Sequence, residues 1–249
     1  LNAYKGVKKI ASFVSEKNGG EGCVRDFCDF ILNYNHRLNM EFSIAGLICV
    51  KYNSTRLPYK NFRKFGNTTL LDIKIQQLLK LDFLNSVVVN TESDYIIDYV
   101  SNKYDNPKLK IVKREYLYAS NEIDNSDFCR NVVSSINEKH VCYSPVTMPF
   151  ITEETYKKGY EILCDGEYDT IVLNADGKQG GGHSYEKHNI CFGFSMISKE
   201  DAIKHGDFIS NKPYYMICNE RERMDIDYPD EFKMCLYHYF NKDARLGLE

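Results

Sequence analysis

The stretch SIAGLICVKYNSTRLPYKN, residues 43–61, joins a continuous apolar run to a basic loop that a proline interrupts. A short apolar run bounded by polar residues is typical of a β-strand buried on both faces of a sheet. Because arginine and lysine side chains bind phosphate oxygens well, we predict that the loop binds a polyphosphate. The alternative is a solvated loop with no ligand. Between residues 51 and 64 there are five cations and no acid: Lys51, Arg56, Lys60, Arg63 and Lys64.

Segments downstream of this stretch alternate between strand and helix patterns. This alternation is typical of a mostly parallel sheet with helices on both faces. We therefore predict a three-layer, Rossmann-like α/β domain over residues 40–249. Ligands of such sheets bind beyond the carboxyl ends of the strands, where the basic loop begins. Strands are predicted at 43–50, 86–91, 108–113, 140–146 and 168–175, and helices at 71–79, 94–104, 152–163 and 229–240.

Residues 1–39 differ in pattern from the rest of the chain. Apolar residues recur at helical spacing from Val7 to Val14 and again from Val24 to Ile31, on either side of the Gly-rich stretch NGGEG. The spacing predicts an N-terminal hairpin of two amphipathic helices. Such a hairpin has no core of its own, so it must pack on the main domain, on a partner subunit or on a further domain. It could also be the end of an upstream segment.

Composition narrows the class of protein. The net charge of −3 and the lack of a basic stripe interleaved with aromatic residues argue against nucleic-acid binding. No run of about 18 apolar residues occurs, so no membrane association is predicted. The nine cysteines form no CxxC pair and are predicted to stay thiols in the cytoplasm. The Gly-rich stretch GKQGGGHS, residues 177–184, lacks the Walker pattern and is predicted to be a mobile loop.

A second polar motif, MDIDYPDEF at residues 224–232, lies far from the basic loop in sequence. If MDID is extended, Asp225 and Asp227 point to one face while Met224 and Ile226 point to the other. Two neighbouring carboxylates repel each other unless a cation lies between them, and they suit Mg²⁺, which completes its shell with water and phosphates. The motif therefore predicts a magnesium site. Alternatively, Asp227 or Asp230 only caps the following helix.

Four segments, in order, resemble one enzyme family. The sequence is similar to the cytidylyltransferases that activate acidic sugars as CMP derivatives, such as CMP-sialic acid, CMP-nonulosonate and CMP-Kdo synthetases. The similarity runs over residues 43–236. The segments are GLICVKYNSTRLPYKNFRKFGNTTLLDIKI, VVVNTESDYI, PVTMPF and PYYMICNERERMDIDYPDEFKMC.

The resemblance assigns roles to individual residues. In that family the first loop reads approximately P-A-R-x-G-S-K-R-L-P-x-K-N and binds the CTP phosphates. Pro145 stands where the family has a base-contacting glutamine, and Asp225 and Asp227 match its Mg²⁺ ligands. The residues that it implies for nucleotide binding are Lys51, which replaces an arginine, Ser54, Arg56, Lys60, Asn61 and Thr147.

The resemblance also implies a reaction, in which the anomeric hydroxyl of an acidic sugar attacks the α-phosphorus of CTP and releases pyrophosphate. Arg56, Lys60 and Asp227 would be catalytic, Arg114 and Asn189 would bind the acceptor sugar, and the enzyme would be a homodimer. Arg130 and Lys187 are further candidates for the acceptor carboxylate. Three alternatives stay open: another sugar or polyol-phosphate nucleotidyltransferase, a noncatalytic nucleotide-binding module of a larger enzyme, and a metal-dependent glycosyltransferase.

Overall fold

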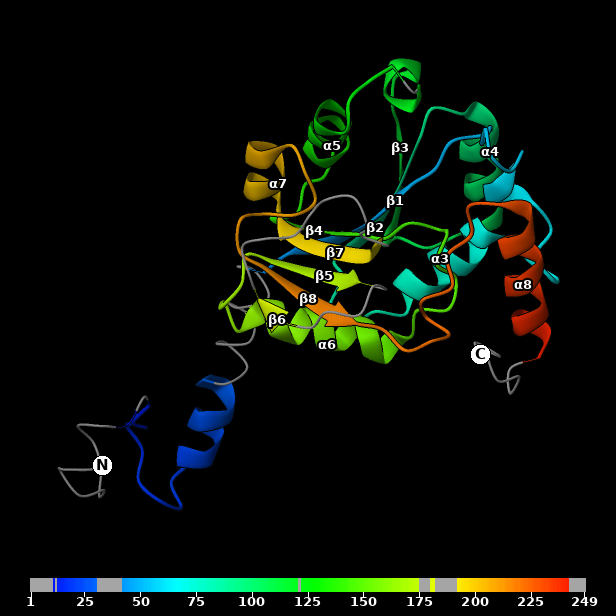
Figure 1. The fold of residues 1–249 in the computed structure, drawn as a ribbon. Coiled ribbons are helices and arrows are strands. Elements are labelled where there is room, and N and C mark those ends of the chain that lie inside the picture. Colours follow the sequence, from blue (N-terminus) through cyan, green and yellow to red (C-terminus); the bar gives the residue numbers. More distant parts are fainter. Residues whose placement is uncertain are drawn as a thin grey trace. The chain divides into compact units, whose positions relative to one another are not determined.

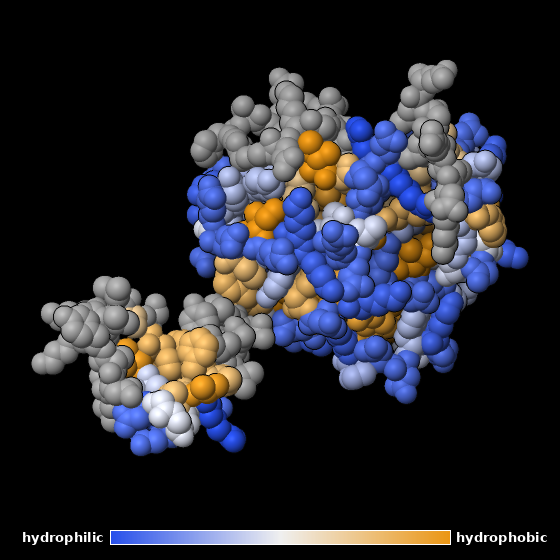
Figure 2. Space-filling model, turned by 90° about the horizontal axis from the view of Figure 1, so that it is seen from below, coloured by the Kyte–Doolittle hydropathy of each residue, from blue (hydrophilic) through white to orange (hydrophobic). Residues whose placement is uncertain are grey.

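The computed structural model describes residues 11, 13–30, 42–120, 122–174, 180–181 and 192–241. The chain divides into two compact units, Leu1–Ser43 and Ile44–Glu249. In the first unit, residues 23–30 form a helix, as predicted (Figure 1). Val24 and Phe27 of this helix are exposed. Figure 2 shows apolar residues on the surface of this unit. Residues 11 and 13–15 have no regular secondary structure, so the predicted first helix of the hairpin is wrong where it is described. Phe13 instead stacks on the helix, with its ring centroid 4.4 Å from that of Phe30.

The second unit is built on one sheet whose described strands follow the order β3-β2-β1-β4-β7-β5-β8-β6. Six of these strands point the same way, while β7 and β6 run antiparallel to their neighbours. The predicted mostly parallel sheet is confirmed. The strands are β1 Ile44–Cys49, β2 Ser86–Thr91, β3 Leu109–Lys113, β4 His140–Tyr143, β5 Thr170–Asn174, β6 Gly180–Gly181, β7 Phe192–Ser198 and β8 Pro213–Ile217.

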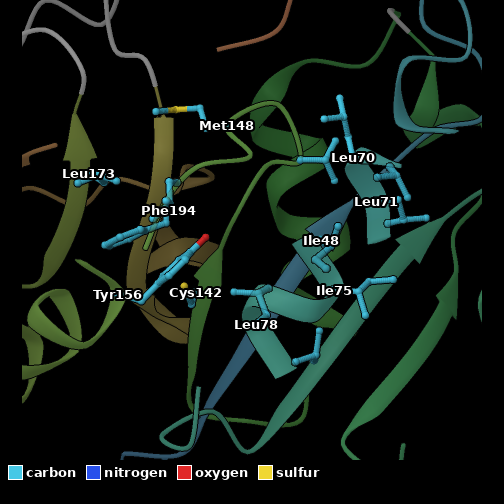
Figure 3. Close-up of a cluster of buried hydrophobic side chains, with 14 of the residues drawn as sticks. Ile48, Leu70, Leu71, Ile75, Leu78, Cys142, Met148, Tyr156, Leu173 and Phe194 are labelled. Atoms are coloured by element: carbon cyan, nitrogen blue, oxygen red, sulfur yellow. The ribbon is translucent and has the colours of Figure 1, made fainter. Parts of the chain in front are cut away.

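Helices cover both faces of this sheet, which gives the three layers that were predicted (Figure 1). The larger apolar cluster lies under α3 Leu70–Leu79, α4 Asp94–Lys103, α6 Glu153–Cys164 and α8 Pro229–Phe240. Figure 3 shows the part of this cluster where α3 packs against β1, with Tyr156 and Phe194 beside it. The smaller cluster lies under α5 Asn125–Ser134 and α7 Lys199–His205. Two short 3-10 helices complete the described elements, η1 Lys60–Phe62 and η2 Tyr116–Ala119.

Local sequence explains most of these elements. The valines of β2 are all buried, as expected for a strand covered on both faces. Thr152 caps α6, because its side chain accepts a hydrogen bond from the Thr155 amide.

The predicted MDID strand is wrong: residues 224–226 form no described strand, although Ile226 is fully buried. Among the described helices, none is long and apolar enough to cross a bilayer. The described elements that were not predicted are β6, β7, β8, α5, α7 and the two 3-10 helices.

Candidate active site

The basic loop leaves the carboxyl end of β1 and folds back on its own start. The Asn61 side-chain amide donates to the Lys51 carbonyl over 2.8 Å and so closes the loop. Leu57 and Lys60 are buried at the base, while Tyr59 adopts a left-handed backbone with φ of 56°. Tyrosine rarely adopts this conformation, so the tight turn is held by its surroundings. The loop therefore directs the Lys60 side chain inward.

Inside the loop, two cations meet a carboxylate from the other end of the chain. Arg56 Nη1 lies 2.6 Å from Asp227 Oδ2, and Lys60 Nζ lies 3.0 Å from Asp227 Oδ1. Lys60 also donates to the Ile226 carbonyl over 2.7 Å. The Arg56 guanidinium lies over the ring of Tyr228, and the Tyr228 side chain together with the Asp227 charge raises the pKa of Arg56. The structure thus brings the three residues predicted to be catalytic into direct contact.

The segment that carries the aspartates is fixed on both sides of Asp227. On one side, the Ile226 amide donates to the Thr147 carbonyl over 3.0 Å. On the other side, the amides of Asp227 and Tyr228 both donate to the Glu231 carboxylate. Glu231 therefore closes the start of α8. Because the Asp227 side chain accepts from Arg56 and Lys60, the alternative that Asp227 only caps the helix is wrong.

The predicted nucleotide-binding residues lie around this contact. Ser54 is half-buried in the basic loop, and Thr147 lies four residues after the end of β4, next to the aspartate segment. Lys51 begins the loop, and its carbonyl is the acceptor that Asn61 uses. These residues come from the exits of β1 and β4, which are neighbouring parallel strands. All of them therefore share the carboxyl edge of the sheet, where α/β proteins bind ligands.

Arg114, predicted to bind the acceptor, lies beneath the site and is buried. Its Nη1 donates to the carbonyl and the side chain of Asn90, and its Nη2 donates to the Val50 carbonyl over 3.0 Å. The same Nη2 lies 3.2 Å from Glu92, whose carboxylate also accepts from the Tyr52 amide. The buried Nε of Arg114 has no hydrogen-bond partner among the described residues. In this arrangement Arg114 joins the ends of β1 and β2 under the basic loop.

The remaining predictions concern Asn189 and Lys187, the Gly-rich stretch 177–184, and Arg130. Asn189 and Lys187 lie outside the described residues, as does most of the Gly-rich stretch 177–184, of which 180–181 form β6. Arg130 lies on α5, where its Nε donates to the Ile203 carbonyl and its side chain is 43% exposed. Arg130 thus keeps part of its guanidinium open to solvent.

The donor set fits the predicted magnesium ion. In the part of the chain that the structure describes, no group of three or more histidine, cysteine, aspartate or glutamate side chains could hold a metal. A protein-only metal cage is therefore not formed there. Mg²⁺, however, commonly takes one or two carboxylates and completes its shell with water and substrate phosphates. Asp227, which contacts Arg56 and Lys60, and Asp225, two residues before it, are the carboxylates that such an arrangement would use.

Comparison with known proteins adds an independent observation. Residues 45–204, more than half of the chain, match the family model described as cytidylyltransferase. The chain belongs to the cytidylyltransferase family. It is therefore a nucleotidyltransferase, and the resemblance at the level of family is confirmed. The family match ends before Asp225 and Asp227, so the placement of these aspartates rests on the geometry above. A search of curated protein sequences found no match.

Solved structures share the fold of this cytidylyltransferase at low sequence identity. A nucleotidyl transferase from Methanothermobacter thermautotrophicus is 12% identical, with a TM-score of 0.63, over 81% of this chain and 99% of that chain. A CMP:2-keto-3-deoxy-manno-octonic acid synthetase complexed with CTP is 9% identical, with a TM-score of 0.62, over 80% and 99%. A 4-diphosphocytidyl-2C-methyl-D-erythritol synthase from Anaerococcus prevotii is 11% identical, with a TM-score of 0.59, over 81% and 98%. The predicted fold is thereby confirmed.

Proposed function

We propose that this cytidylyltransferase transfers CMP from CTP to an acidic sugar and releases pyrophosphate. The observation that supports the proposal best is the contact of Arg56 and Lys60 with Asp227 at the carboxyl edge of the sheet. It joins the phosphate-binding type of loop to a carboxylate suited to a metal ion. Both parts are needed to handle a nucleoside triphosphate.

The chemistry asks the protein mainly for positioning and neutralisation of charge. The acceptor hydroxyl attacks the α-phosphorus in line, and negative charge grows on the leaving pyrophosphate. Arg56 and Lys60 would bind the outer phosphates, so the triphosphate would replace Asp227 as the anion that these cations contact. Lys60 is the more fixed of the two, because it is also held by the Ile226 carbonyl and its side chain is 11% exposed against 54% for Arg56.

Asp225 and Asp227 would hold Mg²⁺, which supplies positive charge to the phosphates when bound. The chain's own contribution is to keep both carboxylates in place. Hydrogen bonds on either side of Asp227, from Ile226 to Thr147 and from Asp227 to Glu231, hold its backbone. A fixed carboxylate needs little reorganisation when the nucleotide arrives, which is the electrostatic advantage of a preformed site.

A cavity of about 270 Å³ beside the end of β4 is our candidate for the acceptor. It is lined by aromatic rings and two polar side chains. The rings of Tyr143 and Phe208 stack there, with their centroids 4.0 Å apart. Aromatic rings can pack on the apolar face of a sugar, while Asn125 and Asp207 can bind hydroxyl groups. Arg130, whose side chain contacts that of Ser126 next to Asn125, is the cation that we propose for the acceptor carboxylate. In this proposal Arg114 does not bind the acceptor and stays buried under the basic loop.

An assay of pyrophosphate release tests the proposal. The purified protein is offered each of the four nucleoside triphosphates, with and without Mg²⁺, against acidic sugars, neutral sugars and polyol phosphates. We expect turnover with CTP, Mg²⁺ and an acidic sugar. Turnover only with a polyol phosphate, or only with another nucleotide, would support a different nucleotidyltransferase. Binding of CTP without turnover on any acceptor would support a noncatalytic module.

The homodimer that the resemblance implies is part of the same proposal. Sedimentation velocity of the full chain at assay concentration distinguishes a dimer from a monomer. We expect a dimer, and a monomeric species with full activity would contradict that part of the proposal.

A further inference from the structure

Lys74, on α3, is fully buried, which is an unusual position for a lysine. Burying an ammonium group is costly unless hydrogen bonds and an opposite charge compensate. Lys74 forms two hydrogen bonds, to the Met148 carbonyl over 3.1 Å and to the Tyr156 hydroxyl over 3.0 Å. It forms no ion pair with a carboxylate of the described residues. A hydrophobic residue at this position would avoid the cost, so the polar contacts of Lys74 call for a reason.

The two partners of Lys74 tie three parts of the fold together. Tyr156 comes from α6, and its hydroxyl lies 2.5 Å from Ser144 Oγ, directly after β4. Met148 ends the same segment, and its side chain lies in the apolar cluster shown in Figure 3. The Ser144 amide in turn donates to the Leu47 carbonyl of β1 over 2.9 Å. Lys74 therefore holds residues 144–148 at both ends, directly at Met148 and through Tyr156 at Ser144.

This segment supports the phosphate site. The Thr147 carbonyl, one residue before Met148, accepts the hydrogen bond from the Ile226 amide. The Ile226 carbonyl accepts from Lys60, and Asp227 follows directly. We propose that Lys74 is a positioning residue of the phosphate site, which fixes the segment after β4 and thereby Ile226, Lys60 and Asp227. The part that concerns nucleotide affinity rests on the proposed function.

The protonation of Lys74 then affects the site. Burial lowers the pKa of Lys74 to about 7. The titratable groups that face it are the Tyr156 phenol from α6 and the Cys142 thiol from β4, and burial raises the pKa of both, that of Cys142 to about 12. Both neighbours are therefore neutral near pH 7, and Lys74 is the group of this cluster that changes charge there.

The two forms of Lys74 bind differently. The ammonium is only a donor, so it gives a charge-assisted bond to the Met148 carbonyl and leaves the Tyr156 proton for Ser144. The neutral amine forms weaker bonds and can accept a hydrogen bond from the Tyr156 hydroxyl, which reverses the direction of that hydrogen bond. The segment should therefore be held more firmly below the pKa of Lys74 than above it.

The test compares Lys74→Met with Lys80→Met, which makes the same change at an exposed position at the end of the same helix. Calorimetry measures the affinity of the full chain for CTP at about pH 6 and about pH 8.5, on either side of the lysine titration. CTP itself titrates in this range, but both variants meet the same CTP at each pH, so the comparison with Lys80→Met removes that effect. We expect Lys74→Met to bind CTP about fivefold more weakly than Lys80→Met at the lower pH, which corresponds to the net contribution of one ordinary hydrogen bond. At the higher pH the two variants should differ by less than about twofold.

Hydrogen exchange of the Ile226 amide gives a second readout that needs no nucleotide. We expect this amide to exchange about fivefold faster in Lys74→Met than in Lys80→Met at the lower pH, while amides of β2 are unchanged. Equal exchange in two folded variants overturns the proposal. If neither wild type nor Lys80→Met binds CTP, the proposed function fails, and the exchange rates still decide the role of Lys74.

A second variant covers the case in which Lys74→Met does not fold. Tyr156→Phe removes the hydroxyl that Lys74 and Ser144 share but keeps the ring. We expect Tyr156→Phe to change both quantities in the same direction as Lys74→Met but by less. At the lower pH its affinity for CTP should fall about twofold, and its Ile226 amide should exchange about twofold faster. A folded Tyr156→Phe variant with the wild-type pH profile and wild-type exchange overturns the proposal.

Discussion

Asp227 bridges two cations that a triphosphate would otherwise contact. Arg56 and Lys60 each contact one oxygen of this carboxylate, so the three side chains together keep a net positive charge that favours a phosphate. If the proposed function is right, phosphate oxygens would contact Arg56 and Lys60 in place of Asp227, and the Asp227 carboxylate would then be available to hold a metal ion. Each of these charged groups would thus stay next to an opposite charge, and leaving one unpaired would be costly in a partly buried site.

The role of Asp227 gives the first prediction. We expect Asp227→Ala to lower turnover by at least about a hundredfold, because it removes both the metal ligand and the anion that orients Lys60. Steady-state assay of pyrophosphate release measures the effect. Asp230→Ala is the matched control. Asp230 lies three residues after Asp227 and forms an exposed ion pair with Lys233. Near-normal turnover in Asp227→Ala would refute the metal role.

Arg114 gives a prediction about stability. We expect Arg114→Gln to lower the free energy of unfolding by about 3 kcal/mol, because it leaves the buried Glu92 carboxylate without its cation. Lys113→Gln, at the neighbouring position, breaks only an exposed pair with Asp94 and should cost less than about 0.5 kcal/mol. Urea unfolding compares the two. Unchanged stability of Arg114→Gln, with weaker binding of the acceptor, would instead favour the role that the resemblance implies.

The sequence predicts the contact of the basic loop with the aspartates but not the position of Arg114. Motif order and the rule for the carboxyl edge of a sheet were enough for Arg56, Lys60 and Asp227. Two acceptors of Arg114 are the backbone carbonyls of Val50 and Asn90, which leave no mark in a side-chain pattern. Lys74 was not predicted either, because a lysine within an apolar helical repeat usually lies on the surface.

Helix α3 is joined to α4 by a buried carboxylate. Asp72 accepts hydrogen bonds from the hydroxyls of Tyr99 and Tyr104 and from Lys103, all from α4 or directly after it. Burial raises the pKa of Asp72, but these hydrogen bonds outweigh it, so the pKa lies below its ordinary value of 3.8. The ionised form is therefore the one that the fold stabilises.

The pH dependence of this pairing can be measured. A carboxyl with a lowered pKa stabilises the fold fully above the unfolded value and loses that contribution as pH falls through the folded value. We expect Asp72→Asn to cost about 2 kcal/mol at neutral pH and progressively less in acid below the ordinary value. Urea unfolding between neutral and acid pH tests this, with the exposed Asp98→Asn as control. A cost that does not change with pH would contradict the account.

At the level of elements, sequence patterns predict the parallel half of the sheet best. Apolar runs such as 86–91 match the observed strand because burial on both faces leaves an unbroken signal. The antiparallel β7 and the parallel β8, which lie on either side of β5, are not predicted, because the pairing of strands depends on partners distant in sequence. The MDID segment alternates like a strand, yet the structure holds it by the single ladder-like bond between Ile226 and Thr147 and by the start of α8.

The division of the chain into two units makes a prediction for the whole molecule. Residues from Ile44 onward contain the whole described sheet and the residues of the phosphate site. A chain that begins at Met40 should therefore keep its melting temperature to within about 2 °C and its affinity for CTP. Calorimetric melting and CTP titration of the shortened and full chains measure both. Loss of folding or of binding would show that the first 39 residues support the site.

A crystal structure with CTP and Mg²⁺ shows whether the triphosphate of CTP binds between the basic loop and Asp227. We expect phosphate density in contact with Arg56 and Lys60, and a metal ion on Asp225 and Asp227. Phosphate density elsewhere, with Arg56 and Lys60 still bound to Asp227, would contradict this placement of the triphosphate.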